Sequence, residues 1–510
     1  MKNKQKEISI IITYIGLILG IGTYFFVTPF AIRSLGESEF GIYNLVYTIV
    51  SYFTVLDFGF GNAIIRYTSK YLALKDYKKL KEINGLFIII YSLIGVISLV
   101  IGVILINNLY NIFPALLISE IEIVDKMMKI ALINIVLSFP LSIFLAILKG
   151  YEKFILAETI HVMKLLLSPL SIIFALILGY RSVGIITIQT IVNLIISIIP
   201  LIYCLFKIKI RIALPKNKAD LEIVNEIIKF SFYVFLGMLV VKVFWSTDQV
   251  ILGAFVSSTA VSICSLVSQI AQYYSSLSET ITKPYLTLIT KNITLVKKEK
   301  IDFTEIFIKV GRVQTYLLTL IITGFLIFGK KFVVLWAGES FIQVYELTLL
   351  ILIPLTVPAV QNVGVAILQA LNIHKFRSIV YFIIAVINVF ISIVLVKKCG
   401  IYGTTFGTVS AIVIGHIVIM NIYYKKKLGL NLRKFWKNVM SIILKALPLV
   451  VIFYIIEFNI KKTGWITLAL EISIYTLLYG IILYKFIITS EEKNRMKEII
   501  GRKKINESNW

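Results

Sequence analysis

The chain is poor in charged residues, cysteine and histidine. Only 15% of its 510 residues are charged and 58% are hydrophobic, which excludes an ordinary soluble globular domain. Cys204, Cys264 and Cys399 are odd in number and lack metal-site spacing, which excludes a disulfide framework and a cysteine-ligated metal site. We therefore expect neither a metal nor a cofactor.

Acidic residues are also scarce: 27 Asp and Glu stand against 52 Lys and Arg, a net charge of +25. Such an excess can indicate nucleic-acid binding, but the basic residues form no patch interleaved with exposed aromatic residues. They lie in alternate connections between apolar stretches, and the mean hydropathy is +0.91. We predict an all-α integral membrane protein with no nucleic-acid partner.

Apolar stretches long enough to cross a bilayer occur about 14 times along the chain. Most Lys and Arg residues lie in one of the two sets of connections, the set that includes both chain ends. Positive residues favour the cytoplasmic side. The pattern predicts a multi-pass protein with both termini in the cytoplasm.

An internal repeat divides the chain. "AILKGYEKF" (146–154) recurs as "AILQALNIHKF" (366–376), and Leu35-Gly36 recurs as Leu252-Gly253, at offsets of about 220 residues. Because each copy holds six spans, we predict two six-helix lobes related by a pseudo-two-fold axis along the membrane normal. The predicted parts are an N-lobe (1–218), a C-lobe (219–430), a two-helix appendage (431–490) and a basic cytoplasmic tail (491–510).

Polar side chains form a stripe along the eighth predicted span. At about 100° per residue they fall within a sector of roughly 100°. The stripe consists of Ser262, Ser265, Gln269, Gln272, Ser276, Glu279 and Lys283. The second span carries a partial counterpart, which consists of Asn44, Thr48, Ser51, Gly59, Asn62 and Arg66. Polar groups at membrane depth face a cavity or one another, so the stripe predicts a hydrated cleft between the lobes, with Arg66 and Lys283 at its cytoplasmic edge. The alternative is hydrogen bonding between packed helices.

Charged residues also lie inside predicted spans. Lys164 and Lys242 each cost about 2.5–3.5 kcal/mol to insert, so we expect a water-filled setting for each, or pairing with Glu158 and Asp248 respectively. Asp57 lies opposite the partial stripe and points into its own lobe, as an ion site, a partner of a lysine or a structural group. The candidates for ion coupling are Asp57, Asp248 and Glu279.

Three stretches carry a family resemblance. "LGESEFGIYNLVYTIVSYFTVLDFGFGNAIIRYTSKY" (35–71), "STDQVILGAF" (246–255) and "AILKGYEKF" resemble the Wzx-type polysaccharide flippases of the multidrug/oligosaccharidyl-lipid/polysaccharide flippase superfamily. The resemblance implies a protein of the bacterial inner membrane that moves an undecaprenyl-pyrophosphate-linked oligosaccharide from the cytoplasmic to the outer leaflet. It further implies assembly of O-antigen, capsule or exopolysaccharide, alternating access driven by a proton or sodium gradient, and a polysaccharide polymerase as a further partner.

Relatives that flip a lipid-linked peptidoglycan precursor use basic cleft residues, which Arg66 and Lys283 resemble in type and rough location. A sugar head needs many hydrogen-bonding groups, and a pyrophosphate needs cations. The candidate substrate-binding residues are Arg66, Lys283, Gln269, Gln272, Ser265, Ser276, Asn44, Asn62, Lys242 and Lys164.

Two alternative functions stay open at this point. A multidrug or organic-cation antiporter on the same fold would need an aromatic or acidic cavity, whereas the stripe here is rich in serine and glutamine with basic ends. A membrane polysaccharide polymerase would need a sizeable outer loop with Arg and His. No nucleotide-binding loop or Ser-His-Asp arrangement is present, so we do not expect an enzyme.

Overall fold

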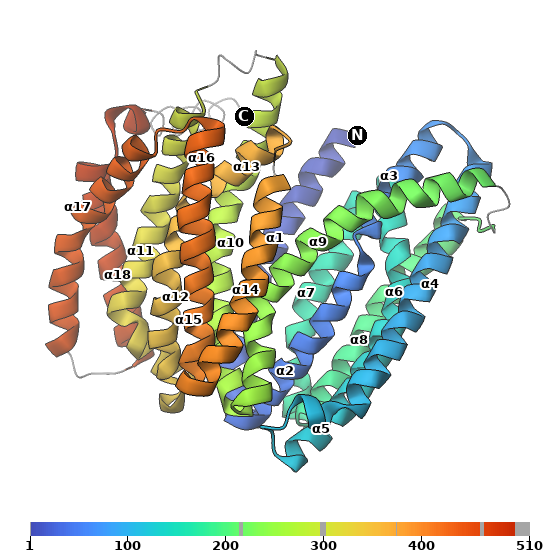
Figure 1. The fold of residues 1–510 in the computed structure, drawn as a ribbon, viewed down its shortest axis with the longest axis horizontal. Coiled ribbons are helices and arrows are strands. Elements are labelled where there is room, and N and C mark those ends of the chain that lie inside the picture. Colours follow the sequence, from blue (N-terminus) through green and yellow to red (C-terminus); the bar gives the residue numbers. More distant parts are fainter. Residues whose placement is uncertain (1, 214–217, 296–301, 374, 460–463, 495–510) are drawn as a thin grey trace, which may run out of the picture. The chain divides into compact units, whose positions relative to one another are not determined.

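The computed structural model describes residues 2–213, 218–295, 302–373, 375–459 and 464–494. Every regular element within these ranges is a helix (Figure 1). In order they are α1 (Lys2–Leu35), α2 (Glu37–Phe53), η1 (Thr54–Asp57), α3 (Phe60–Ala73), α4 (Tyr77–Asn107), α5 (Leu109–Ile112), α6 (Ile118–Gly150), α7 (Phe154–Ile177), α8 (Ser182–Tyr203), η2 (Cys204–Ile208), α9 (Lys218–Phe255), α10 (Ser258–Leu295), α11 (Phe303–Ala337), η4 (Glu339–Phe341), α12 (Gln343–Val360), α13 (Asn362–Ala370), α14 (Lys375–Cys399), α15 (Ile401–Ala411), η5 (Ile412–Ile419), α16 (Met420–Leu428), α17 (Leu432–Asn459), α18 (Trp465–Ile482) and η6 (Leu483–Ile487).

The helices are long because hydrocarbon offers no partner to a backbone N–H or C=O group, and a helix satisfies these groups within itself. Within the described ranges, 12 helical stretches are long and apolar enough to span a membrane. α1, with 34 residues, and the polar α10, with 38, are long helices outside that set. The predicted all-α membrane fold is confirmed, while the count of fourteen spans stays a prediction.

The chain forms two compact units. The first unit contains Met1–Ser265 and Ala385–Thr404, and the second contains Leu266–Ile384 and Thr405–Trp510. This division reflects packing and does not test the repeat, so the lobes predicted at 1–218 and 219–430 stay a prediction. Most of the predicted tail (491–510) lies outside the described residues.

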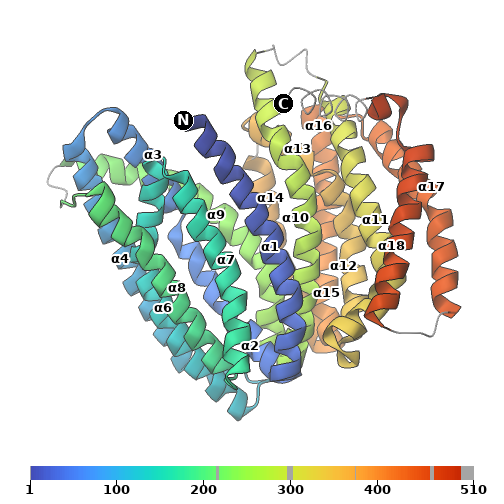
Figure 2. The ribbon, with the colours of Figure 1, turned by 180° about the vertical axis from the view of Figure 1, so that it is seen from behind.

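Within the first unit, α6 packs against α2, α3, α4, α7 and α8. α1 lies along α7, as Figure 2 shows. The apolar side chains of Ile143, Ile147 and Leu148 on α6 are fully buried among these helices. α6 therefore forms the centre of this unit, and polar residues on it are held at a fixed position.

Within the second unit, α17 and α18 pack on α11 around a core that includes Phe328, Val450 and Tyr475. The segment after η6 is also fixed: the Arg312 guanidinium on α11 donates to both carboxylate oxygens of Glu492, at 3.1 Å each. The predicted appendage helices are thus packed onto α11 within this unit.

The second predicted span is a broken helix. α2 ends at Phe53, η1 follows, and α3 begins at Phe60, with Phe58 and Gly59 both left-handed at φ 51° and 73°. The predicted partial stripe assumed one continuous helix of 100° per residue. Because two left-handed residues redirect the backbone, that count does not continue from Asn44 across the break to Asn62 and Arg66. The prediction of one continuous polar face on this span was therefore wrong.

Candidate functional site

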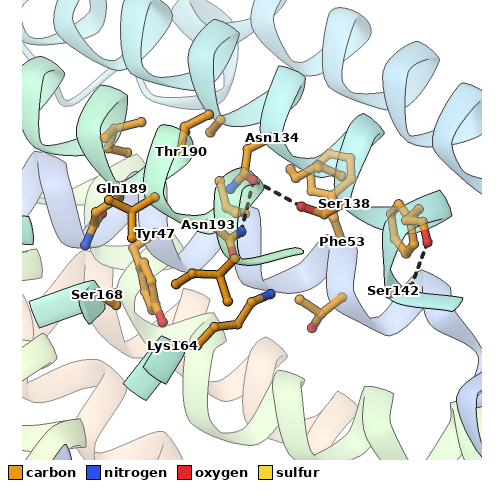
Figure 3. A pocket seen from close by; sticks show the side chains of 18 of the residues that line it. Tyr47, Phe53, Asn134, Ser138, Ser142, Lys164, Ser168, Gln189, Thr190 and Asn193 are labelled. Carbon is orange, nitrogen blue, oxygen red and sulfur yellow. Dashed lines mark hydrogen bonds between the residues drawn. The ribbon is translucent and has the colours of Figure 1, made fainter. Parts of the chain in front are cut away.

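A cavity of about 670 Å³ lies inside the first unit. Its walls come from α1, α2, η1, α6, α7 and α8, with one residue from α9. This volume lies within the range of small-molecule sites. Figure 3 shows that side chains from α6, α7 and α8 converge on it.

Three helices give the cavity its polar walls through residues three or four positions apart, a spacing that places side chains on one helix face. The polar lining residues on these helices are Asn134, Ser138 and Ser142 on α6, His161, Lys164 and Ser168 on α7, and Gln189, Thr190 and Asn193 on α8. The cavity is therefore lined by amides, hydroxyls, an imidazole and an amine.

The amides form a network that leaves groups free. Asn193 Nδ2 and Ser138 Oγ both donate to Asn134 Oδ1, at 3.0 and 3.1 Å, and the Tyr43 hydroxyl donates to Gln189 Oε1 at 3.2 Å. Within the part of the chain that the structure describes, the Asn134 amide nitrogen and the Asn193 amide oxygen bind no other side chain. A bound ligand would find both a donor and an acceptor held in place.

Lys164 is the basic residue of this cavity. Its Nζ donates to Ser197 Oγ at 3.0 Å, and among the described residues it forms no ion pair. Glu158, one predicted partner, pairs instead with Lys149 at 2.9 Å. Since an ammonium group has three donors, Lys164 keeps capacity for an anionic ligand.

Asp57 lines the same cavity at the break between η1 and α3. Its Oδ1 accepts a hydrogen bond from the Tyr91 hydroxyl at 2.5 Å. Asp57 thus lies just before the start of α3 while facing the cavity. Its predicted orientation into its own half of the chain agrees with this position.

A second polar cluster lies where α2, α6 and α10 begin, and we refer to Ser38, Glu120 and Ser258 as the polar junction. Glu120 Oε1 accepts from Ser38 Oγ at 2.5 Å and from Ser258 Oγ at 2.6 Å, and the two serine oxygens lie 3.1 Å apart. A Cβ at Gly41 would come within 1.9 Å of the Ser258 carbonyl oxygen, so only glycine permits this approach. One carboxylate therefore joins the starts of three helices.

The predicted stripe on α10 is partly buried and partly exposed. Ser262 and Ser265 are buried in the first unit, where Ser262 Oγ donates to the Glu37 carbonyl and Ser265 Oγ to the Val261 carbonyl. In the second unit Gln269 Nε2 donates to the Tyr273 hydroxyl at 3.1 Å.

The rest of the stripe lies on the opposite side of α10 from its packed face. Tyr274 and Ser278 bind Thr356 and the Ala359 carbonyl of α12. The stripe residues beyond Gln269 are the half-buried Ser276 and the exposed Gln272, Glu279 and Lys283. Their predicted position beside a cleft stays a prediction.

Five other candidates lie outside the cavity lining. Asn44 Nδ2 donates to its own helix at the Phe40 carbonyl, and Asn62 is exposed on α3. Arg66 is exposed and lies 5.8 Å from the Tyr67 ring centroid. Lys242 is half-buried on α9, as is the ion-coupling candidate Asp248.

Sequence reasoning missed most of the cavity. Of its polar lining residues it selected Lys164 and Asp57 and passed over Asn134, Gln189 and Asn193. The sequence does contain a signal for these residues. Asn134 and Ser138 are four residues apart, as are Gln189 and Asn193, and this spacing places polar side chains on one face of a helix. Within the described ranges, no group of three or more His, Cys, Asp or Glu side chains could hold a metal ion.

Comparison with solved structures identifies the fold. The structure is similar to that of the lipid II flippase MurJ in an inward closed conformation, with a TM-score of 0.71 and 15% identity over 94% of this chain and 99% of that one. It is also similar to an inward-facing multidrug resistance MATE family transporter of the MOP superfamily, with a TM-score of 0.64 and 14% identity over 82% of this chain and 98% of that one. A Vibrio cholerae MATE transporter, VcmN, gives a TM-score of 0.54 and 14% identity over 84% of this chain and 99% of that one.

None of the curated proteins matches the chain. A family model described as "Polysaccharide biosynthesis protein" matches residues 6–290, more than half of the sequence and all of the helices that line the cavity. The chain is a multi-pass membrane protein with the fold shared by a lipid flippase and multidrug transporters, and it belongs to the polysaccharide biosynthesis protein family.

Proposed function

We propose that this protein is a flippase that carries an undecaprenyl-pyrophosphate-linked oligosaccharide from the cytoplasmic to the outer leaflet of the bacterial inner membrane. The observation that carries the proposal is the cavity inside the first unit, which combines free amide groups with one lysine that has no carboxylate partner among the described residues. The family match and the flippase fold support the same reading. The sugars would serve capsule, O-antigen or exopolysaccharide assembly, with a polymerase acting on the delivered units.

The chemistry of the cavity suits each polar part of that substrate. Sugar hydroxyls both donate and accept, so they pair with amide groups such as those of Asn134, Gln189 and Asn193. A pyrophosphate is an anion, and Lys164 offers the point charge that binds phosphate. Asp57, Tyr47 and Phe53 also line this cavity, as an organic-cation antiporter would need. Lys164 opposes a cationic ligand, however, and the family match favours the flippase.

Ion coupling is the second part of the proposal, and we assign it to Asp57. A carboxylate at membrane depth is costly and marks proton or ion pathways, and Asp57 faces the same cavity as Lys164 and His161. Protonation would weaken the hydrogen bond that Asp57 accepts from Tyr91 on α4 and so alter the break between α2 and α3. Asp57→Asn should transport at the same rate with and without a pH gradient, whereas the wild type should be faster with one.

A paired substitution tests the substrate site. Asn134→Leu together with Asn193→Leu removes both partners of one hydrogen bond. It also removes the acceptor of the Ser138 hydroxyl, but Ser138 is only half-buried and lines the cavity, so the cost in stability is smaller than that of a fully buried unsatisfied group. The double variant should insert and fold normally but fail to export the glycan in cells that depend on this protein.

The matched control is Gln361→Leu with Asn421→Leu, an amide pair bonded at 2.9 Å outside the cavity, which should leave export intact. Normal export by the Asn134 and Asn193 double variant at wild-type abundance would contradict the proposed site.

A further inference from the structure

A second pocket, of about 330 Å³, lies in the first unit next to the polar cavity. Its walls come from α2, η1, α4, α5, α6 and α9, and we refer to it as the apolar pocket. The Phe53 side chain lines both spaces. The two spaces are therefore neighbours that share a wall.

The lining of the apolar pocket offers no free hydrogen-bonding side chain. Of its 12 lining residues only Tyr52 and Thr247 carry a polar side-chain atom, and these two hydroxyls hydrogen-bond to each other at 2.7 Å. A pocket lined by apolar side chains favours an apolar occupant over water, so we expect a hydrocarbon occupant.

The occupant can reach the pocket from the bilayer. Ile101 lines the pocket and is 38% exposed on α4. It belongs to a surface of this helix that also exposes Leu93, Val96 and Val100. This surface is typical of a helix that faces lipid, so a chain that lies in hydrocarbon can enter beside it.

We infer that the apolar pocket binds the first isoprene units of the lipid carrier while its sugar and pyrophosphate occupy the polar cavity, with the Phe53 side chain turned aside to let the chain pass between the two spaces. This inference rests on the proposed function, because it identifies where the carrier of that same substrate lies. An apolar cavity of about 150 Å³ holds one benzene molecule, so about 330 Å³ holds about a dozen carbon atoms, or two to three isoprene units.

The shared wall explains why one amphiphile suits both spaces. A lipid-linked sugar changes from charged pyrophosphate to hydrocarbon within one bond of the phosphate. Lys164 lies on the polar side of the wall and Leu105 on the apolar side. Phe53 would mark the position of that change, and the pocket would select carriers that begin with a prenyl chain.

Photolabelling tests the inference with farnesyl pyrophosphate that bears a diazirine on its last isoprene unit, added to the purified protein in lipid nanodiscs. Labelling should fall on peptides of α2, α4 or α9 that line the pocket. Unlabelled farnesyl pyrophosphate should suppress it at least tenfold, and palmitoyl lysophosphatidylglycerol at the same concentration should not. Equal suppression by the two competitors would overturn the inference, because the pocket would then take ordinary acyl chains.

A pair of matched tryptophan variants, one inside the apolar pocket and one outside it, tests whether the probe binds there. Leu105→Trp places a larger side chain in it, whereas Leu99→Trp changes a residue on the same helix that is 42% exposed and does not line the pocket. Labelling should fall at least tenfold in the first variant and stay unchanged in the second. Val250→Phe, from the α9 wall, should act like Leu105→Trp and replaces it if that variant does not fold.

The outcomes separate this inference from the proposed function. Labelling that persists in both pocket-filling variants, beside a wild-type protein that exports glycan, would refute the apolar pocket alone. Loss of export in the Asn134 and Asn193 double variant with labelling intact supports both proposals. A wild-type protein that moves no lipid-linked glycan refutes the function, whatever the labelling shows.

Discussion

Replacing Lys164 with methionine should weaken transport and leave the protein as stable as before or more stable. Lys164 Nζ has one hydrogen bond, to Ser197 Oγ at 3.0 Å, and no carboxylate partner among the described residues. A lysine at membrane depth costs up to about 2.5–3.5 kcal/mol, whereas one hydrogen bond returns only about 0.5–1.5 kcal/mol. Methionine removes both the cost of the buried charge and the gain from the hydrogen bond. The free energy of unfolding should therefore rise by as much as about 1–3 kcal/mol.

Transport by Lys164→Met should weaken, whereas the free energy of unfolding should rise. A hydrogen bond to a charged group is worth about 1.5–3 kcal/mol. At about 1.4 kcal/mol per tenfold change in affinity, losing the contact with pyrophosphate should raise the half-saturating substrate concentration roughly ten- to 150-fold. Lys164→Arg keeps the charge and should retain most of the transport.

The assay measures the transfer of a lipid-linked oligosaccharide between the two leaflets of proteoliposomes over a range of substrate concentrations, with thermal unfolding of the same samples. Lys445→Met is the control, because Lys445 lies on α17 in the second unit and binds the Phe486 carbonyl at 2.9 Å. Wild-type transport by Lys164→Met would refute the role in substrate binding. A lower unfolding temperature would show instead that Lys164 stabilises the fold.

Two further predictions concern the polar junction and the ion pair between Arg312 and Glu492. With the three native cysteines replaced, Ser38→Cys with Ser258→Cys should block transport when oxidised and recover with reductant, if transport proceeds by alternating access that separates α2 from α10 at the junction. Unimpaired transport by the cross-linked protein would contradict this. Burial opposes ionisation of Glu492, but the hydrogen bonds from Arg312 and from the Thr489 backbone hold its pKa below the usual value. A carboxyl group whose pKa is lower in the folded state stabilises the fold above its unfolded pKa of about 4.3. That stabilisation is lost as the pH falls toward the folded-state pKa. Thermal unfolding should therefore show Glu492→Gln less stable than wild type at pH 7, with the difference shrinking below about pH 4.3; a difference independent of pH would refute the contribution of charge.

Most helices of this protein were predictable because a long apolar run is enough to indicate a membrane span. The break at Phe58 and Gly59 was not, since Gly59 and Gly61 were treated as part of a continuous span. Two left-handed residues are a local feature that hydropathy does not register. The angular relation between Asn44 and Arg66 depended on that missed feature.

The cavity was predictable only in part. Asp57 and Lys164 stood out because charge inside a span is costly. Asn134 and Asn193 did not, because an amide can bind a neighbouring helix as readily as a ligand. Which use applies depends on how α6, α7 and α8 pack around one space, and a pattern within one helix does not contain that information.

The proposed function requires that the cavity of the first unit holds the sugar of a lipid-linked oligosaccharide while it crosses the membrane. Its most direct test uses proteoliposomes that hold an undecaprenyl-pyrophosphate-linked fluorescent oligosaccharide in both leaflets, with a glycosidase that cannot cross the bilayer added outside. We predict that wild-type protein allows cleavage of nearly all of the substrate, while the Asn134→Leu, Asn193→Leu double variant allows only the half in the outer leaflet. Cleavage that stops at half with the wild type, or that reaches completion at the same rate with the double variant, would contradict the account.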